Sequence, residues 1–281
     1  MKVCSIFLFF YLWASNVYVL AEAFTQDLLE DELWDDGLAE ISVFDAIEVR
    51  YGMPRKTEVR HILVKEMFSA KAMVKADDWR EKGAYEVIKL NQVIKVPTGS
   101  YDYYQMHSNF WHKKTGNLIK FSLASIDSCG NTYKEGRIEK GKLNYTARTY
   151  WQGMDQVEKK LKLPDDLLFY DELPWKLRTM AWKDGKSFTA LLMTTTVTNK
   201  ADSLKPESVQ ISVKDSPQGW LVLVEGESKD QFLFDKSSPH ELVEWKKRDG
   251  GKLVKRTSLR IPYWQLNKPG DEEVYGLAFS R

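Results

Sequence analysis

The stretch YEVIKLNQVIKV, residues 85–96, decides the fold class of this chain. Apolar residues recur in it at alternate positions, and polar residues lie between them. The apolar side consists of Ile88, Leu90, Ile94 and Val96. A strand that is buried on one face shows this period of two, and Pro97-Thr98-Gly99 then turns the chain.

The same alternation continues in both directions from this stretch. Before it, residues 41–51 and 57–68 flank a turn at Gly52-Met53-Pro54 and predict a long hairpin. After it, further strands are predicted over residues 102–112, 118–127, 140–151, 187–198, 207–213, 220–225, 231–235, 241–245 and 252–261. Repetition of this kind predicts a mainly β protein built on a large curved antiparallel sheet, a half-barrel-like meander.

One region lacks the period of two. Between about residues 153 and 182, Asp165–Phe169 and Leu173–Arg178 predict one or two short helices, with Pro174 in the first turn of the second. We therefore expect a single β-rich domain over residues 24–281, with this helical insertion packed on one face of the sheet.

The turn Lys114-Thr115-Gly116-Asn117 also predicts a register for the strands beside it. If Thr115 and Gly116 centre the turn, Cys129 faces Asp102 and His107 faces Ala124. Ile119, Phe121 and Leu123 would then mark the buried face of the second strand.

Composition excludes two classes of protein. The 281 residues include 36 aromatic side chains, far too many for a disordered chain. The 41 basic and 40 acidic residues nearly cancel, so the chain lacks the positive charge of a dedicated nucleic-acid binder.

The N-terminus has the three parts of a secretory signal peptide: Lys2, an apolar stretch from Val3 to Leu20, and Ala21-Glu22-Ala23. We expect cleavage near Ala23 and a periplasmic or secreted protein without a transmembrane segment; an uncleaved N-terminal anchor is the alternative. Cleavage removes Cys4 and leaves Cys129, which excludes an intramolecular disulfide and a cysteine-rich zinc site.

Several short segments occur in a distinctive order: Tyr51-Gly52, Val74-Lys75-Ala76-Asp77, Ile88-Lys89-Leu90-Asn91, Thr98-Gly99-x-Tyr101-x-Tyr103, Met106-x-Ser108-x-Phe110, Cys129-Gly130-Asn131-Thr132 and Asp171-Glu172-Leu173-Pro174. From about Leu38 to Arg178 this order resembles a family of uncharacterised exported bacterial proteins. The closing stretch, Ser238-Pro239-His240 to Tyr263-Trp264, is similar to the end of domains of unknown function with lipoprotein-carrier-like half-barrels. The resemblance implies such a half-barrel, and its motifs carry no known chemistry. Members are sometimes labelled septum formation inhibitor, a cytoplasmic enzyme, and the signal peptide conflicts with that label.

Candidate catalytic and metal-binding residues are few. Cys129 as a nucleophile would need a histidine, and the predicted register keeps His107 and His112 away from it, so we expect a buried or half-buried thiol. His61 and His240 could approach Cys129 only through the tertiary fold. His107 and His112 are five residues apart and point to opposite faces, which argues against a shared metal ion. No cofactor is indicated.

Two charged groups have structural explanations. The basic residues Lys246, Lys247, Arg248, Lys252, Lys255 and Arg256 flank the turn Asp249-Gly250-Gly251. They favour a solvated hairpin, with contact to an anionic head group as the alternative. The acid pairs Asp165-Asp166 and Asp171-Glu172 stand at predicted helix starts, where they complement the helix dipole.

The segment Trp220–Val224 is apolar on both faces, so other apolar groups must cover each face of this strand. Either the helical insertion covers it as ordinary core, or the two form a groove for an apolar ligand. The residues of such a groove would be Leu167, Leu168, Trp175, Leu177, Trp220, Leu221, Val222, Leu223 and Val224.

These observations favour a non-enzymatic protein of the cell envelope that binds a lipid or another hydrophobic ligand. The first alternative is a structural or protein-interaction module that contacts an envelope protein without a small ligand. The second is an exported hydrolase, for which no nucleophile, base and oxyanion group can be placed together. The sequence does not specify the ligand or the oligomeric state.

Overall fold

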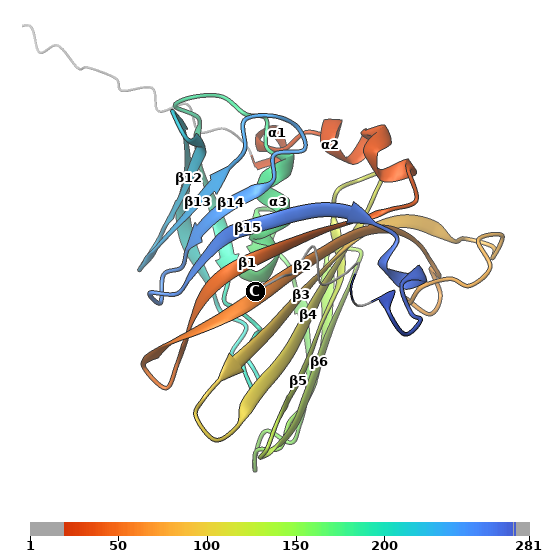
Figure 1. Cartoon of the computed structure of the whole chain (residues 1–281), viewed down its shortest axis with the longest axis vertical. Coiled ribbons are helices and arrows are strands. Elements are labelled where there is room, and N and C mark those ends of the chain that lie inside the picture. Colours follow the sequence, from red (N-terminus) through yellow and green to blue (C-terminus); the bar gives the residue numbers. More distant parts are fainter. Residues whose placement is uncertain (1–19, 272, 274–281) are drawn as a thin grey trace, which may run out of the picture.

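The computed structural model describes residues 20–271 and 273 of the chain. They form one sheet of fifteen strands that curves around a short helical segment (Figure 1). The prediction of a mainly β protein with a large curved sheet and a short helical insertion is confirmed. Most of the predicted signal peptide, residues 1–19, lies outside the described residues.

The strands form two consecutive meanders. The first contains β1 (Ala39–Arg50), β2 (Met53–Phe68), β3 (Tyr85–Pro97), β4 (Asp102–His112), β5 (Leu118–Asp127), β6 (Gly130–Glu139), β7 (Lys142–Arg148) and β8 (Gln156–Lys162). The second contains β9 (Leu167–Phe169), β10 (Ser187–Met193), β11 (Pro206–Ser216), β12 (Gly219–Glu225), β13 (Lys229–Phe234), β14 (Leu242–Lys246) and β15 (Lys252–Ile261).

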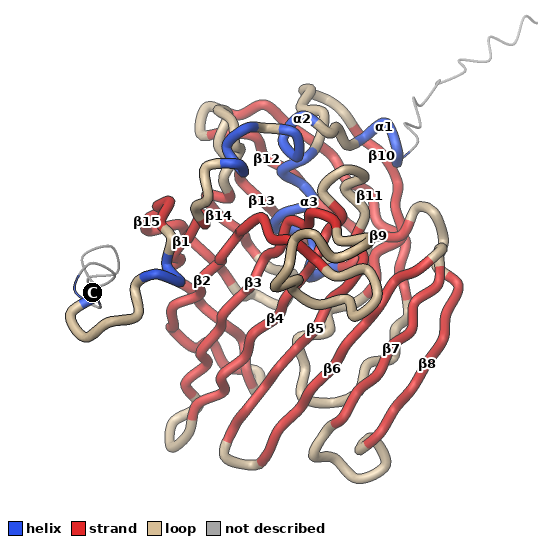
Figure 2. The backbone as a smooth tube through the Cα atoms, turned by 90° about the vertical axis from the view of Figure 1, so that its right-hand side faces the viewer, coloured by secondary structure: helices blue, strands red, loops and turns tan. Residues whose placement is uncertain are grey.

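Pairing of β1 with β15 joins the two meanders, so β8 and β9 are the edges of the sheet. Only residues 163–166 separate these edges in the sequence, and the sheet therefore curves almost into a barrel (Figure 2). Every neighbouring pair is antiparallel except β9 and β10, which run parallel.

The helical elements are short: α1 (Leu20–Ala23), α2 (Asp27–Glu30), η1 (Glu32–Asp35), η2 (Tyr170–Glu172), α3 (Leu173–Lys176), η3 (Leu177–Thr179) and η4 (Tyr263–Gln265). Within the described residues, none of the helices has the length and apolar character needed to cross a membrane. Residues 170–179, which we call the helical plug, lie inside the curved sheet (Figure 1). Leu173, Trp175 and Leu177 of the plug are buried in the two main core clusters.

The helical part of the insertion is narrower than the predicted range 153–182, because β8 and β9 occupy part of it. In β8 the alternating apolar pattern is broken at Lys159, which lies between Val157 and Leu161. The Lys159 Nζ atom donates to the carbonyl of Asp202 over 2.7 Å, so a charged residue takes an apolar position of the pattern.

A second segment, residues 194–205, connects β10 to β11, and we call it the polar strap. The sequence predicts a strand up to Thr198, but β10 ends at Met193. The β-branched threonines favour a strand. Instead, the Thr195 and Thr196 hydroxyls donate to the Asp171 carboxylate over 2.6 and 3.0 Å.

The register between β4 and β5 differs from the prediction by one residue or more. His107 faces Leu123 rather than Ala124, and a bulge lies between Phe110 and Trp111. The turn is longer than assumed, because the amides of Thr115 and Gly116 both donate to the His112 carbonyl. Ile119 consequently leaves the inner face and packs beside Phe68 in a separate cluster.

Candidate functional site

A pocket of about 260 Å³ lies between the sheet, the plug and the strap, and we call it the mouth pocket. Strands β1 and β3, the plug, the strap and the β14–β15 turn line it, with Val49, Arg50, Ile94, Val96, Tyr170, Asp171, Thr195, Val197, Trp245, Lys247 and Arg248 among its residues. It lies where β1 ends at Arg50, and we call this end of the strands the mouth end.

One wall of the mouth pocket is apolar. Ile94, Val96 and Trp245 belong to the largest core cluster, and Val197 of the strap packs against the same cluster. These residues are fixed by the sheet, since Ile94 and Val96 continue the alternating pattern of β3. The pocket therefore borders the core directly.

The floor of the pocket is a polar network centred on Asp171 of the plug. The Gln92 amide donates to the Asp171 carbonyl over 2.7 Å, and the Asn109 amide donates to it over 3.0 Å. The Asp171 carboxylate accepts hydrogen bonds from Thr195 and Thr196 of the strap. Asp171 thus holds the plug and the strap together.

His107 extends this network away from the pocket. Its Nε2 atom lies 2.9 Å from the Thr196 hydroxyl and 3.7 Å from the Asp171 carboxylate. Burial lowers the pKa of His107, and the negative charge of Asp171 only partly offsets this effect. His107 and Thr196 are each 1% exposed, so a substrate cannot reach this hydroxyl–imidazole pair in the folded state.

Basic residues form another part of the lining, next to Trp245. Arg248 Nε donates to the fully buried carboxylate of Asp230 over 2.6 Å, and the guanidinium also contacts Glu207. Arg50 places its guanidinium carbon 4.0 Å from the centre of the Tyr103 ring. Within the described residues, two buried N–H groups of these basic residues, Arg50 Nε and Arg248 Nη2, have no hydrogen-bond partner.

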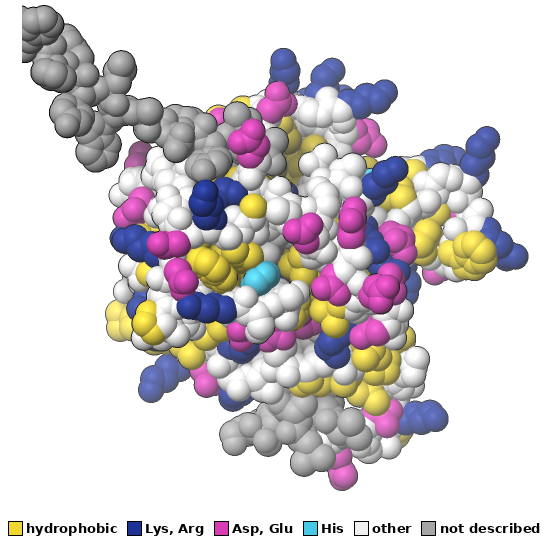
Figure 3. Space-filling view, turned by 90° about the horizontal axis from the view of Figure 1, so that it is seen from above, with side chains coloured by type: hydrophobic (Ala, Val, Ile, Leu, Met, Phe, Trp, Pro, Cys, Tyr) yellow, Lys and Arg dark blue, Asp and Glu magenta, His cyan; other side chains and the backbone are white. Residues whose placement is uncertain are grey.

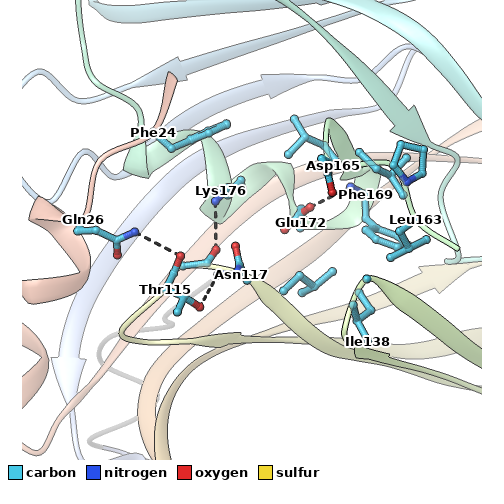
Figure 4. Close-up of a pocket in the computed structure, with 16 residues that line it drawn as sticks. Phe24, Gln26, Thr115, Asn117, Ile138, Leu163, Asp165, Phe169, Glu172 and Lys176 are labelled. Atoms are coloured by element: carbon cyan, nitrogen blue, oxygen red, sulfur yellow. Dashed lines mark hydrogen bonds between the residues drawn. The ribbon is translucent and has the colours of Figure 1, made fainter. Parts of the chain in front are cut away.

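A larger pocket, of about 550 Å³, opens at the other end of the strands, where the sheet edges β8 and β9 meet (Figure 4). We call it the seam pocket. Leu163, Leu167 and Phe169 form part of its wall, and Glu172 and Lys176 of the plug lie beside them. Burial raises the pKa of Glu172 and lowers that of Lys176, and the pair lies among polar backbone groups such as the Gly116 carbonyl.

The structure divides the nine predicted groove residues among several surroundings. Leu168, Leu177, Val222 and Val224 share the largest core cluster, and Trp220 packs against it. Trp175 belongs to the second cluster, against which Leu167 packs. Leu221 and Leu223 lie on the other face of β12, and Leu221 pairs with Leu233 of β13. Leu167 and Leu168 line the seam pocket, whereas Trp220–Val224 line neither pocket. A ligand-binding role for these nine residues stays a prediction.

The polar floor was not predicted, although the sequence contains a signal for it. In the alternating stretch 85–96, Gln92 occupies the position between Leu90 and Ile94 where the pattern requires an apolar residue. The inner face of β4 is also polar, with Gln105, His107 and Asn109 at alternate positions. Because these inward-facing residues are polar, the sequence of β4 does not show which of its two faces is buried.

Two other predictions about candidate residues need correction. Cys129 is exposed rather than buried, because Asp127 pairs with Gly130 and places the thiol at the tip of the β5–β6 turn. The basic residues around the β14–β15 turn are extensively paired with acids, and Lys247 and Arg248 line the mouth pocket.

Among the described histidines, His61 and His107 are buried. Burial lowers the pKa of His61 to about 3. No cluster of three or more potential metal-ligating side chains occurs within the described residues.

Two solved structures are similar to the chain. One is a β-barrel-like protein of the domain-of-unknown-function family DUF1849 from Brucella abortus, with 9% identity and a TM-score of 0.42 over 79% of this chain and 96% of that one. The other is a DUF1089 family protein from Pseudomonas aeruginosa, with 11% identity and a TM-score of 0.37 over 64% of this chain and 87% of that one. No family model and no curated protein matches the sequence.

Proposed function

We propose that the chain is an exported, non-enzymatic protein of the cell envelope that binds a small hydrophobic ligand with an anionic or oxygen-rich end in the mouth pocket. One observation carries this proposal: the apolar residues Ile94 and Val96 and the basic residues Arg50, Lys247 and Arg248 line the same pocket. A carboxylate or phosphate oxygen of a ligand would be attracted to these cations. Burial of the ligand's apolar part would supply the remaining affinity.

The size of the pocket narrows the class of ligand. Small-molecule sites typically enclose about 300–1,000 Å³, and the mouth pocket, at about 260 Å³, is slightly smaller than this range. A single acyl chain or a small ring system with a carboxylate or phosphate end fits this description better than a two-chain phospholipid.

The seam pocket is a second candidate for the same class of ligand, since the predicted groove residues Leu167 and Leu168 line it. The buried Glu172 and the half-buried Lys176 make it more polar than the mouth pocket. The two sites can be separated by one substitution in each: Val197→Asp in the mouth pocket and Leu167→Asp in the seam pocket. Both residues are partly buried, so the two variants introduce the same charge at comparable depth.

The test is native mass spectrometry of protein extracted gently from its own host, followed by solvent extraction and identification of the released molecule. We expect a bound single-chain lipid or similar amphiphile. Val197→Asp and Arg50→Gln should lower the bound fraction about tenfold or more, with Leu167→Asp and the far-ultraviolet circular dichroism spectrum unchanged. Loss of ligand in Leu167→Asp alone would move the site to the seam, and absence of any ligand would favour the interaction-module alternative.

Export is tested separately. N-terminal sequencing of protein from the exported fraction should give a start at or near Phe24. Protein that retains Met1 and stays with the membrane fraction would contradict the signal-peptide prediction and favour the anchor.

A further inference from the structure

Exposed apolar side chains are concentrated at the mouth end of the strands. Thirteen large apolar side chains of the described residues are exposed, and nine of them lie at or next to the turns of this end. Five belong to the β1–β2 and β7–β8 turns or their first residues: Tyr51, Met53, Tyr150, Trp151 and Met154. Exposed apolar groups gathered in this way mark surfaces that interact with a protein or a membrane.

The other four connect these turns across the outer face of the sheet. Tyr104 pairs directly with Ile126, and Ala124 lies between Met106 on one side and Tyr133 on the other. Neighbours in such pairs contact each other, so the four form one patch. We call the nine residues together the aromatic rim.

Contacts between the turns make the rim continuous. The Tyr51 hydroxyl lies 3.1 Å from that of Tyr101 in the β3–β4 turn. At the other end, the Tyr150 ring packs so closely on Gly130 of the β5–β6 hairpin that a Cβ atom on this glycine would lie 2.5 Å from the ring.

Most bases at the mouth end are paired with acids, and three exposed lysines are not. Among the bases that form ion pairs are Arg148, Lys246, Lys247, Arg248 and Lys252. Lys56, Lys200 and Lys205 are exposed and form no ion pair with any described residue. Lys200 lies 5.2 Å from the centre of the Trp151 ring, so one of these unpaired lysines lies against an aromatic residue of the rim.

Figure 3 shows the molecule from the opposite side, looking down on the other end of the strands. On that surface acidic and basic side chains lie side by side, with several separate apolar patches between them. Of the thirteen exposed large apolar residues in the described part of the chain, only four lie outside the aromatic rim.

We propose that the aromatic rim docks the protein on the surface of an anionic phospholipid bilayer. Tyrosine and tryptophan prefer the boundary between head groups and acyl chains, and lysine and arginine are attracted to anionic head groups. The unpaired lysines Lys56, Lys200 and Lys205 favour an anionic lipid surface over a protein with a purely apolar contact face. Arg50 of the mouth pocket directly precedes Tyr51 of the rim, so docking turns this end of the sheet, with the pocket, toward the membrane. The docking stands on surface residues and does not depend on a ligand in the pocket.

The test is co-sedimentation with vesicles of phosphatidylcholine, with and without phosphatidylglycerol. We expect binding only when phosphatidylglycerol is present, and loss of binding at high salt. The double variant Tyr150→Ser/Trp151→Ser should weaken binding about tenfold or more, because each aromatic group loses its contact with the interface. Trp79→Ser is the matched control, since Trp79 is 70% exposed and lies in the β2–β3 connection at the other end of the strands.

The contribution of charge is tested by Lys56→Glu/Lys200→Glu, with Lys71→Glu/Lys82→Glu in the β2–β3 connection as control. The first pair should abolish the preference for phosphatidylglycerol, and the second should leave it unchanged. All variants carry the same N-terminus, so any leader contributes equally to each.

A fluorophore on the exposed Cys129 thiol, which lies at this end, gives an independent readout. Its emission should shift to shorter wavelength on anionic vesicles. The proposal fails if the wild-type protein ignores both kinds of vesicle, or if the control variants lose as much binding as the rim variants. It also fails if the protein forms dimers that Tyr104→Ser dissociates while vesicles have no effect, because the rim would then be a protein interface.

Discussion

The helical plug and the polar strap lie inside the same sheet, but apolar burial contributes more to holding the plug and hydrogen bonding more to holding the strap. Leu173, Trp175 and Leu177 anchor the plug through apolar burial. The strap instead places Thr196 and Asp202 inside the sheet, and both make hydrogen bonds with side chains of the strands. Apolar burial tolerates small displacements, whereas each hydrogen bond of the strap needs one partner at one distance.

The difference is clearest at Lys134, which is fully buried on β6 and donates to Asp202 over 2.8 Å and to the Thr196 carbonyl over 2.9 Å. Burial lowers the pKa of Lys134, and Asp202 and Asp171 oppose this effect. A buried ion pair of this kind contributes little net stability but is strongly unfavourable when one partner is lost. We therefore infer that the plug contributes most to stability and that the strap contributes mainly to the arrangement of the pocket floor.

The largest expected effect follows from truncating the plug. Trp175→Ala removes a side chain that is 1% exposed and packs against Trp34 and Trp111. We expect the free energy of unfolding to fall by about 3–5 kcal/mol in urea titrations, because the cavity cannot collapse completely. Hydrogen exchange should accelerate across the whole sheet. A smaller loss confined to residues 170–179 would show that the plug is an appendage rather than part of the core.

The strap should respond differently to the loss of its buried charge pair. Lys134→Met leaves Asp202 buried without its cation, and we expect a loss of about 3 kcal/mol. Hydrogen exchange should accelerate first at residues 194–205, with the plug still protected. The double variant Lys134→Met/Asp202→Asn should recover part of the loss, because no unpaired charge remains. If the double variant is as unstable as the single one, the pair does not act as a unit.

The sequence predicted the plug and most strands for the same physical reason. Apolar residues that are buried on one face must recur with the period of the element, as in Leu173-Pro174-Trp175-Lys176-Leu177 of the plug and residues 88–96 of β3. The strap has no such period. Apart from Leu204, its buried side chains are threonine, asparagine and aspartate, which also occur in exposed loops. The run Thr194–Thr198 therefore predicts the end of a strand rather than a strap.

The mouth pocket was harder to predict than the fold, because its parts come from distant segments. Arg50, Asp171 and Arg248 meet only after the sheet has closed through the β1–β15 pair. Periodicity places a residue on a face but does not bring two faces together. The β4–β5 pair shows a second limit: a bulge between Phe110 and Trp111 moves Ile119 away from the predicted inner face, and periodicity does not reveal such a shift.

The stability of the protein at acid pH should separate the plug from the strap, because one buried histidine lies beside each of them. Burial lowers the pKa of His61, near the plug, to about 3 and also lowers that of His107, next to the strap. The unfolded chain takes up these protons near pH 6.5, so the free energy of unfolding is greatest above that pH and falls as the pH decreases. For His61 this fall continues toward about pH 3. Each histidine contributes up to about 1.4 kcal/mol per pH unit between pH 6.5 and its own pKa in the folded protein.

The variants His61→Phe and His107→Gln separate the two contributions in urea titrations at several pH values. Each should show a shallower fall in stability below pH 6.5 than the wild-type protein. Burial raises the pKa of Glu172, which acts in the opposite direction, but it is common to all three proteins and cancels in the comparison. An unchanged pH dependence in both variants would contradict the assignment of the acid sensitivity to these histidines.

The smallest effect is expected at Cys129, which belongs to neither segment but reports on one of them. Its thiol is exposed and its backbone amide donates to Asp127 over 2.6 Å, so Cys129→Ala should change the free energy of unfolding by no more than about 0.5 kcal/mol. Asp127 also accepts a hydrogen bond from Asn199 of the strap over 2.7 Å. A fluorophore on Cys129 should therefore change its emission in Lys134→Met, where the strap loosens, at denaturant concentrations that leave the plug folded. A signal that changes only with global unfolding would mean that strap and plug release together, and the distinction between them would be lost.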